Sequence, residues 1–562
     1  MSGRERLWLL HAFHVVVLLL PLLELIGAAA IAEDGPLVSA PVGSIRGKVE
    51  TFEGVQVDEF LGIPYAKPPV GDLRFALPVP FGNVEGEFNA TNFGARCLQP
   101  PMKAFISPGA VSEDCLHLNV FRKTGTTGDD KKPVVVMVHG GGFSVGAASD
   151  LFYYSPPLVV FGDVIVVSMN YRLGLLGFAD MKQLAPGNLG LFDQRLALEW
   201  IQDNIRAFGG DPDRVTLMGV SAGSISVNAQ ISSPLNRDGR KRFHAVIMDA
   251  GVLSAGFVLV PDLVFAKVKK IAATAGCTTD GPEMVACLRQ IDAKKLLELS
   301  YDAEDQNTWF SFKPTTDGKF IAADIAKDVR DNANEFLKVK TMLGAAKDEG
   351  SMFVWESFDF TFDDFPTLDT EDKFVAWCAK LAKRYDHPID MNDENVRKSV
   401  AATYYKKNPS RMLDASTFVG DGTFICPTKA FAKSYAKVNN AVYVYKFERK
   451  LRRNYTVFDP NVLGAFHSSG FTHMSGCFFG LVGLVPGLDK IDDEDRAYFL
   501  DSIRMVADFA KSDEPPQFRG VRWPNFAKGE GVMVFDEAAR IEKTLYGEGR
   551  CEKVFGVFEP TV

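Results

Sequence analysis

Ser221 lies in the pentapeptide Gly-Val-Ser-Ala-Gly of residues 219–223, between two segments of different character. Residues 214–218 form a short apolar run that predicts a buried strand, and residues 222–231 carry small and apolar side chains at helical spacing. A Gly-x-Ser-x-Gly sequence at a strand-to-helix turn holds the serine hydroxyl on a sharp bend, where it can attack a carbonyl carbon. The pattern therefore predicts a strand, a tight turn and a helix, with Ser221 as a candidate nucleophile.

The same pentapeptide occurs a second time around Ser144, so the context has to separate the two serines. The run His-Gly-Gly-Gly of residues 139–142 follows a strand-like valine run and ends two residues before Ser144. Glycines adopt positive φ without a Cβ clash, so the backbone of such a run can approach a substrate oxygen closely. N–H groups in turns of this kind stabilise the oxyanion of acyl-transfer reactions. We therefore predict Ser221 as the nucleophile and interpret Ser144 as a chance match.

A serine nucleophile needs a general base, and the chain contains eight histidines. In enzymes built on this turn, the acid and then the histidine follow the serine along the chain, which leaves His387, His467 and His473. His387 precedes a proline in a charged stretch and is predicted to lie in a surface turn. His467 lies in a glycine- and serine-rich stretch, residues 464–470, that suits a loop presenting a side chain. His467 is the predicted base, with His473 as the alternative.

The acid that orients the base is not decided by spacing alone. Glu349 follows the strand-like residues 339–346, and its neighbour Asp348 is expected to face away. Asp249 is a rival, because it ends the strand expected after the helix that follows Ser221. A carboxylate at a strand end is often a helix cap or a turn former, so both acids stay open on these grounds.

Further motifs identify a family that this chain resembles, from about Val42 to Pro524. They lie at residues 60–66, 68–71, 74–75, 113–116, 139–143, 170–172 and 208–212. With these motifs the chain resembles the type-B carboxylesterases, a group that includes cholinesterases and their non-catalytic adhesion relatives. The resemblance implies an α/β-hydrolase fold, in which helices wrap a mostly parallel central sheet and helical insertions lie over the active site.

The resemblance also implies roles for single residues. It makes Ser221 the nucleophile, His467 the base and Glu349 the acid, in preference to Asp249. It implies that the backbone N–H groups of Gly141, Gly142 and Ala222 form the oxyanion hole. Residues 309–314 resemble the segment that walls the acyl pocket, so Phe310 is a candidate substrate-binding residue, although an ordinary core aromatic is an equal interpretation.

Three departures from the family pattern bear on the substrate. Val220 and Gly470 stand where this family usually has glutamates, and no tryptophan lies between Cys97 and Cys115. Cholinesterases use a tryptophan there to hold a quaternary ammonium by a cation–π contact. We therefore predict a site with less negative charge near the nucleophile, which favours neutral esters over choline esters.

Residues 1–32 have the features of a secretory signal peptide. Arg4 and Arg6 precede a long apolar run, and residues 30–32 supply a small-x-small cleavage pattern. The apolar run is also long enough to span a bilayer, so a retained signal anchor is the alternative. We predict that the leader is removed, that residues 33–562 form one carboxylesterase domain without a stable membrane anchor, and that the protein is secreted or lies in the secretory-pathway lumen.

Eight cysteines fit an oxidising compartment. The family resemblance implies the disulfides Cys97–Cys115 and Cys277–Cys287. A further pair as in cholinesterases would join Cys426 to Cys551, but the pairing of these two and of Cys378 and Cys477 stays open. Asn89 and Asn454 begin Asn-x-Thr sequences, which are glycosylation acceptors when exposed in the lumen.

The charge pattern excludes some functions. The net charge of −9 gives no reason to expect a nucleic acid or an anionic membrane as partner. No cysteine has the spacing of a metal site, and we expect neither a metal nor an organic cofactor. The charged residues from about Asp363 to Pro409 are predicted to form a helical insertion over the active site, with their charges on a solvated face.

The sequence therefore predicts a serine carboxylesterase that hydrolyses small carboxylic esters through an acyl-enzyme and is not a cholinesterase. The intact set of Ser221, Glu349 and His467 argues against the first alternative, a non-catalytic adhesion or interaction protein. A lipase would share these residues and is the second alternative. The natural substrate and the oligomeric state are not predicted.

Overall fold

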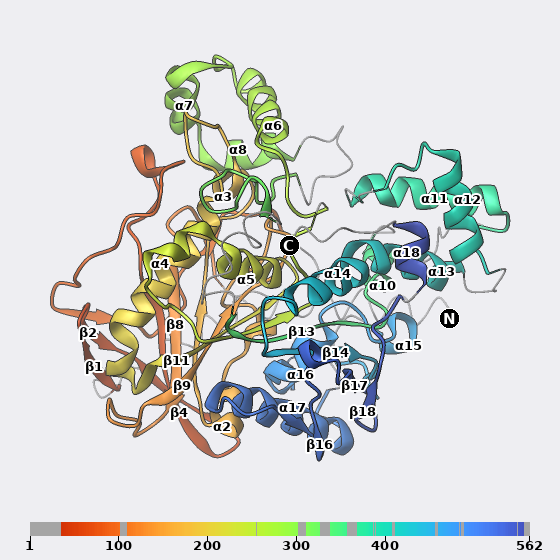
Figure 1. Cartoon of the computed structure of the whole chain (residues 1–562). Coiled ribbons are helices and arrows are strands. Elements are labelled where there is room, and N and C mark those ends of the chain that lie inside the picture. Colours follow the sequence, from red (N-terminus) through yellow and green to blue (C-terminus); the bar gives the residue numbers. More distant parts are fainter. Residues whose placement is uncertain are drawn as a thin grey trace, which may run out of the picture.

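One large sheet of eleven hydrogen-bonded strands runs through the computed structural model (Figure 1). In order across the sheet, its strands are β18 (Arg540–Glu542), β17 (Val532–Phe535), β14 (Val442–Phe447), β13 (Lys340–Ala346), β12 (Ala245–Asp249), β11 (Gly210–Val220), β9 (Lys132–Val138), β10 (Ile165–Met169), β8 (His117–Lys123), β4 (Val55–Pro64) and β3 (Lys48–Phe52). The strands from β17 to β10 are parallel, whereas β18, β8, β4 and β3 pair antiparallel with their neighbours.

Smaller sheets and the helices surround this sheet. The smaller sheets are β1 (Leu37–Ala40) with β2 (Gly43–Arg46) and β5 (Glu87–Asn89), β6 (Arg96–Cys97) with β7 (Val111–Ser112), and β15 (Gln517–Phe518) with β16 (Val521–Arg522). The helices are α2 (Pro156–Gly162), α3 (Gly174–Phe178), α4 (Leu189–Asn204), α5 (Ala222–Ser232), α6 (Pro261–Thr274), α7 (Gly281–Gln290), α8 (Ala293–Ser300), α10 (Ser351–Glu356), α11 (Glu371–Arg384), α12 (Glu394–Tyr404), α13 (Arg411–Gly420), α14 (Cys426–Tyr435), α15 (Pro460–Leu463), α16 (Ser469–Ser475), α17 (Asp493–Lys511) and α18 (Arg550–Val554).

The structure describes most of the chain. The described residues are 35–101, 109–254, 256–301, 311–325, 338–356, 368–385, 387, 389–406, 411–455, 459–482, 484, 488–547 and 549–555. The predicted leader, residues 1–32, and the candidate pocket residue Phe310 lie outside them. In this part of the chain, no helix combines the length and the apolar composition needed to cross a membrane.

Strand β9 shows why the sheet has a core on both faces. Val134, Val136 and Val138 pack into one hydrophobic cluster, while Val135 and Met137 pack into another. Successive side chains of a strand point to opposite faces, so an unbroken apolar run suits a strand that is covered on both sides. Parallel strands buried in this way give the valine-rich runs that the sequence shows.

Helices cover each face of the sheet. Helices α4 and α5 contribute Leu198 and Ile225 to the cluster that contains Val134. Helices α2 and α17 pack against each other and contribute Leu158 and Phe499 to the cluster on the other face. The predicted α/β class, with helices wrapping a mostly parallel sheet, is confirmed by this architecture.

The charged segment from residue 363 to 409 is helical in its described part. It contains α11 and α12, which lie apart from the sheet beside α13 and α18 (Figure 1). Tyr385 follows α11 directly and reaches a pocket that is described below. Helices α6, α7 and α8 gather at another end of the molecule (Figure 1).

Candidate active site

Ser221 occupies a sharp turn between β11 and α5, with φ of 56° and ψ of −125°. Few residues with a Cβ adopt positive φ, and such conformations persist where the surroundings enforce them. The two glycines of the pentapeptide make the turn possible. A Cβ at Gly219 would lie 2.3 Å from the Gly223 carbonyl oxygen, and a Cβ at Gly223 would lie 2.1 Å from that of Val138. The turn therefore requires the glycines that flank the serine.

The glycine-rich turn after β9 lies against Ser221. Gly141 has φ of 108°, and a Cβ there would lie 2.1 Å from the Val145 carbonyl oxygen. Gly142 has φ of 60°, and it lines one pocket together with Ser221 and Ala222. Ala222 is the first residue of α5, so its N–H has no partner within the helix. Two of the three backbone positions predicted for an oxyanion hole, Gly142 and Ala222, therefore line the same pocket as Ser221, and Gly141 directly precedes Gly142 in the turn.

A packed polar network supports this turn. The ring of His139 stacks on Tyr171, with centroids 4.2 Å apart, and its Nδ1 donates to the Gly140 carbonyl at 2.9 Å. The Gly140 N–H donates to the Tyr153 hydroxyl at 2.7 Å. Burial lowers the pKa of His139 to about 4, so the imidazole is neutral near pH 7. Ser144 is buried within the same turn and does not line the pocket that contains Ser221.

Glu349 and His467 come together in the interior. His467 Nδ1 lies 2.5 Å from Glu349 Oε2 and donates a hydrogen bond to it. The other carboxylate oxygen, Oε1, accepts the Ala346 N–H at 2.6 Å. Both side chains are almost fully buried, at 1% exposure for Glu349 and 2% for His467. The carboxylate is held from two sides and fixes which imidazole nitrogen carries the proton.

The loops that carry these two residues are joined by their backbones. The Asp348 N–H donates to the Ala465 carbonyl at 2.9 Å, and the Asp348 carboxylate accepts the Ala465 N–H at the same distance. Ser351 Oγ donates to the Leu463 carbonyl at 2.7 Å. Asp348 is therefore occupied with the loop of His467, which leaves Glu349 as the carboxylate that meets the imidazole.

The imidazole of His467 lies behind the aromatic wall of the pocket. Its ring stacks on Phe424, with centroids 4.4 Å apart, and packs at 5.0 Å from the ring of Phe353. Both phenylalanines line the pocket that contains Ser221. His467 Nε2 is buried and has no hydrogen-bond partner among the residues that the structure describes. No hydrogen bond therefore joins this nitrogen to Ser221 in the described structure.

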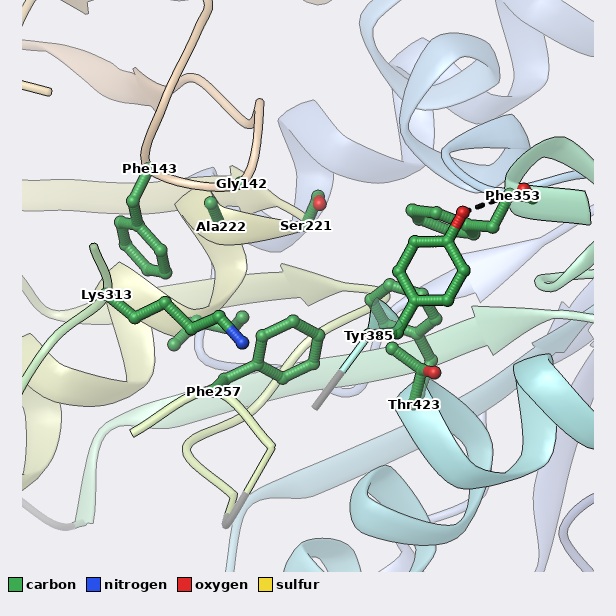
Figure 2. A pocket seen from close by; sticks show the side chains of 11 residues that line it. Gly142, Phe143, Ser221, Ala222, Phe257, Lys313, Phe353, Tyr385 and Thr423 are labelled. Carbon is green, nitrogen blue, oxygen red and sulfur yellow. Dashed lines mark hydrogen bonds between the residues drawn. The ribbon is translucent and has the colours of Figure 1, made fainter. Parts of the chain in front are cut away.

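The pocket beside Ser221 has a volume of about 350 Å³, part of it open to solvent (Figure 2). A π-helical turn between α13 and α14, Asp421–Ile425, contributes Thr423 and Phe424 to its wall. Turns of this type inside a helix are frequent at functional sites. Aromatic side chains from five parts of the chain dominate the lining, namely Phe143, Phe257, Phe353, Tyr385 and Phe424.

Lys313 brings an amine, which carries a positive charge when protonated, into this largely apolar lining (Figure 2). The side chain is 1% exposed, and its ammonium donates to the Gly256 carbonyl at 2.9 Å. The ammonium also lies 5.8 Å from the centre of the Phe257 ring. Sequence reasoning missed Lys313, although it belongs to the segment 309–314 that resembles an acyl-pocket wall. Phe310, the candidate from the same segment, lies outside the described residues.

The rival histidines have other surroundings. His473 is fully buried in α16, and its Nδ1 donates to the Ser469 carbonyl at 2.7 Å. The prediction of a surface turn at His387 is wrong, because its ring is 9% exposed and stacks on Phe418. Burial lowers the pKa of both histidines to about 3. The charged residues around His387 in the sequence concealed its apolar environment in the fold.

Three disulfides are present in the described chain, Cys97–Cys115, Cys277–Cys287 and Cys426–Cys551. The third joins α14 to α18 across 125 residues of sequence. Cys378 and Cys477 are buried thiols. The two glycosylation candidates, Asn89 and Asn454, are both exposed.

The chain is similar to known proteins over nearly its whole length. The sequence model of the carboxylesterase family matches residues 34–552. A cholinesterase of Mus musculus is 31% identical to this chain over 530 residues, which cover 89% of this chain and 82% of that protein.

Proposed function

Because the chain belongs to the carboxylesterase family and has the α/β-hydrolase fold, we propose that it is a serine carboxylesterase with Ser221 as nucleophile, His467 as base and Glu349 as acid. One observation carries this proposal. The hydrogen-bonded pair of Glu349 and His467 packs against the wall of the same pocket in which Ser221 meets the glycine-rich turn.

The proposed reaction has two halves. Ser221 Oγ attacks the ester carbonyl carbon while His467 Nε2 takes the hydroxyl proton, and the N–H groups of Gly141, Gly142 and Ala222 bind the oxyanion. The C–O bond to the alcohol breaks as His467 returns the proton to the leaving oxygen, which leaves an acyl-enzyme. Water then attacks the acyl carbon by the same route and releases the acid and the free serine.

The lining of the pocket supports the proposal that the substrates are neutral rather than cationic esters. A positive charge in a buried, aromatic environment repels a second cation much more strongly than it does in water. The ammonium of Lys313 lies in the wall of the pocket, and Val220 places an apolar side chain next to Ser221. We propose that the enzyme is not a cholinesterase, although a cholinesterase is among its relatives.

Labelling with a fluorophosphonate tests the proposed function directly. Wild-type protein, the Ser221→Ala variant and the Ser144→Ala variant are treated with the probe under the same conditions. We expect labelling of the wild type and of Ser144→Ala, and none of Ser221→Ala. Absence of labelling in a folded wild type would contradict the proposal and favour a non-catalytic interaction protein.

We further propose that the protein is secreted or resides in the secretory-pathway lumen. The three disulfides fit an oxidising compartment. The exposed Asn89 and Asn454 suit glycosylation there. Loss of residues 1–32 and a glycosidase-sensitive increase in mass, measured on protein from a eukaryotic secretion system, would support this location.

A further inference from the structure

Asp249 lies between the elements that carry Ser221 and His467. It is the last residue of β12, next to β11 in the sheet, and it is 1% exposed. Its main-chain carbonyl accepts the N–H of Ser221 at 2.9 Å. This bond places the carboxyl group of Asp249 at a defined position relative to the turn of the nucleophile.

The side chain of Asp249 reaches the segment of the histidine. Its Oδ2 accepts the Phe471 N–H at 3.1 Å, and Phe471 lies in the first turn of α16, which begins two residues after His467. Its Oδ1 accepts a hydrogen bond from the hydroxyl of Tyr445 in β14. Both contacts are distant in sequence: Tyr445 lies 196 positions after Asp249, and Phe471 lies 222 positions after it.

Gly470 makes the approach of Asp249 possible. A Cβ at Gly470 would lie 2.5 Å from Asp249 Oδ1, which is closer than real Cβ atoms come to other atoms. The absence of a side chain at Gly470 therefore leaves room for the carboxyl group of Asp249. This is a physical reason for the departure at Gly470, where related sequences usually have a glutamate.

Three ionisable side chains interact with Asp249. Glu349 follows β13, Tyr445 belongs to β14, and His467 precedes α16. Burial, with a smaller contribution from Glu349, raises the pKa of Asp249 to about 7. Burial also raises the pKa of Tyr445 well above its ordinary value of 10, so its hydroxyl stays protonated and donates.

We infer that Asp249 is a positioning residue that holds the segment of His467 in register with the turn of Ser221. Its main-chain carbonyl accepts a hydrogen bond from the N–H of Ser221. Its carboxyl group accepts one from the N–H of Phe471 in the first turn of α16, which follows His467 closely in the chain. A displacement of about 1 Å between reacting groups can cost about a hundredfold in rate. This inference rests on the proposed function of Ser221 and His467.

The variants Asp249→Ala and Asp249→Asn distinguish the effect of the hydrogen bonds of Asp249 from the effect of its negative charge. Alanine removes both hydrogen bonds, so we expect kcat on a neutral p-nitrophenyl ester, counted per fluorophosphonate-reactive site, to fall about tenfold to a hundredfold with KM nearly unchanged. Asparagine can still accept the Phe471 N–H, so kcat should stay within a few-fold of the wild type. The acidic limb of its kcat/KM profile should differ from that of the wild type, because asparagine removes a carboxylate whose charge interacts with that of His467.

A matched pair of tyrosine variants provides the control. Tyr445→Phe removes the donor to Asp249, whereas Tyr443→Phe makes the same change two residues earlier in β14, where the ring contacts Phe509. We expect Tyr445→Phe to change kcat and the acid limb and Tyr443→Phe to change neither. Near-ultraviolet circular dichroism and the melting temperature report folding for every variant.

Three outcomes are decisive. Folded Asp249→Ala with kcat within twofold of the wild type would overturn the inference, even if its melting temperature fell. If Asp249→Ala does not fold, an unchanged kcat and acid limb in Tyr445→Phe would overturn it, and a change in both would support it. A folded wild type that neither hydrolyses esters nor reacts with fluorophosphonate would instead refute the proposed function.

Discussion

Glu349 Oε2 lies 2.5 Å from His467 Nδ1, although the two residues are 118 positions apart in the chain. A carboxylate at this nitrogen keeps the proton on Nδ1 and leaves Nε2 free to accept another. It also stabilises the imidazolium that forms when Nε2 is protonated. The pair therefore supports the proposed roles of His467 as general base and of Glu349 as its orienting acid.

Replacing Glu349 by glutamine tests this relationship. The amide keeps the size of the side chain but removes the negative charge, and we expect kcat to fall by about three to four orders of magnitude, since loss of the corresponding carboxylate in other serine enzymes has an effect of this size. Ester hydrolysis under saturating substrate measures the change. Glu298→Gln, at an exposed residue of α8, is the matched control and should retain full activity.

Replacing Lys313 by methionine tests the preference for neutral esters. Methionine keeps the unbranched apolar stem and removes the ammonium, so a cationic substrate is no longer repelled. We expect the ratio of kcat/KM for a choline ester to that for its neutral 3,3-dimethylbutyl isostere to rise about tenfold or more. An unchanged ratio in an active variant would show that Lys313 does not act on the charge of the substrate.

Buried neutral histidines predict how stability depends on pH. In the folded state the pKa of His387 is about 3, below its ordinary value of 6.5, so the unfolded chain binds more protons between these limits. His387 therefore lowers the free energy of unfolding once the pH falls below about 6.5, and this destabilisation grows until the pH nears 3. Against wild type, His387→Phe should show a smaller loss of melting temperature between pH 6.5 and 4, measured by calorimetry. An equal loss in both proteins would contradict this.

Two of the three disulfides are expected to differ clearly in their effect on stability. Cys426–Cys551 closes a loop of 125 residues and Cys277–Cys287 a loop of 10. The chain-entropy relation gives about 5 kcal/mol for the longer loop and about 3 kcal/mol for the shorter. Denaturant unfolding of the two double-alanine variants should rank them in this order, and the reverse order would show that native-state effects outweigh chain entropy.

Local sequence predicted the turns around the nucleophile well. At the ends of β9 and β11, glycines are required within a few residues of one another, because any Cβ there would overlap backbone atoms. The strand, the turn at Ser221 and helix α5 therefore follow from a short stretch of chain. The fold class was implied by the family resemblance, and apolar runs such as 134–138 fit it, since they suit strands that are covered on both faces.

The choice among distant side chains came from tertiary structure. The spacing of the residues left Glu349 and Asp249 equal, and only the family resemblance favoured Glu349. In the fold, Glu349 meets His467, while Asp249 meets Tyr445 and the N–H of Phe471. These strand-end carboxylates look alike in sequence, but the parallel register of β12, β13 and β14 directs them to different partners.

The burial of charged and polar residues was equally invisible to sequence. His387 lies among charged residues along the chain, yet it stacks on Phe418, and Lys313 enters the wall of the pocket. The sequence by itself determined what depends on neighbouring residues: the strands, the glycine turns and the sharp bend at Ser221. Only the tertiary structure decided which distant groups meet that serine, because contacts across hundreds of residues depend on how the strands align and the helices pack.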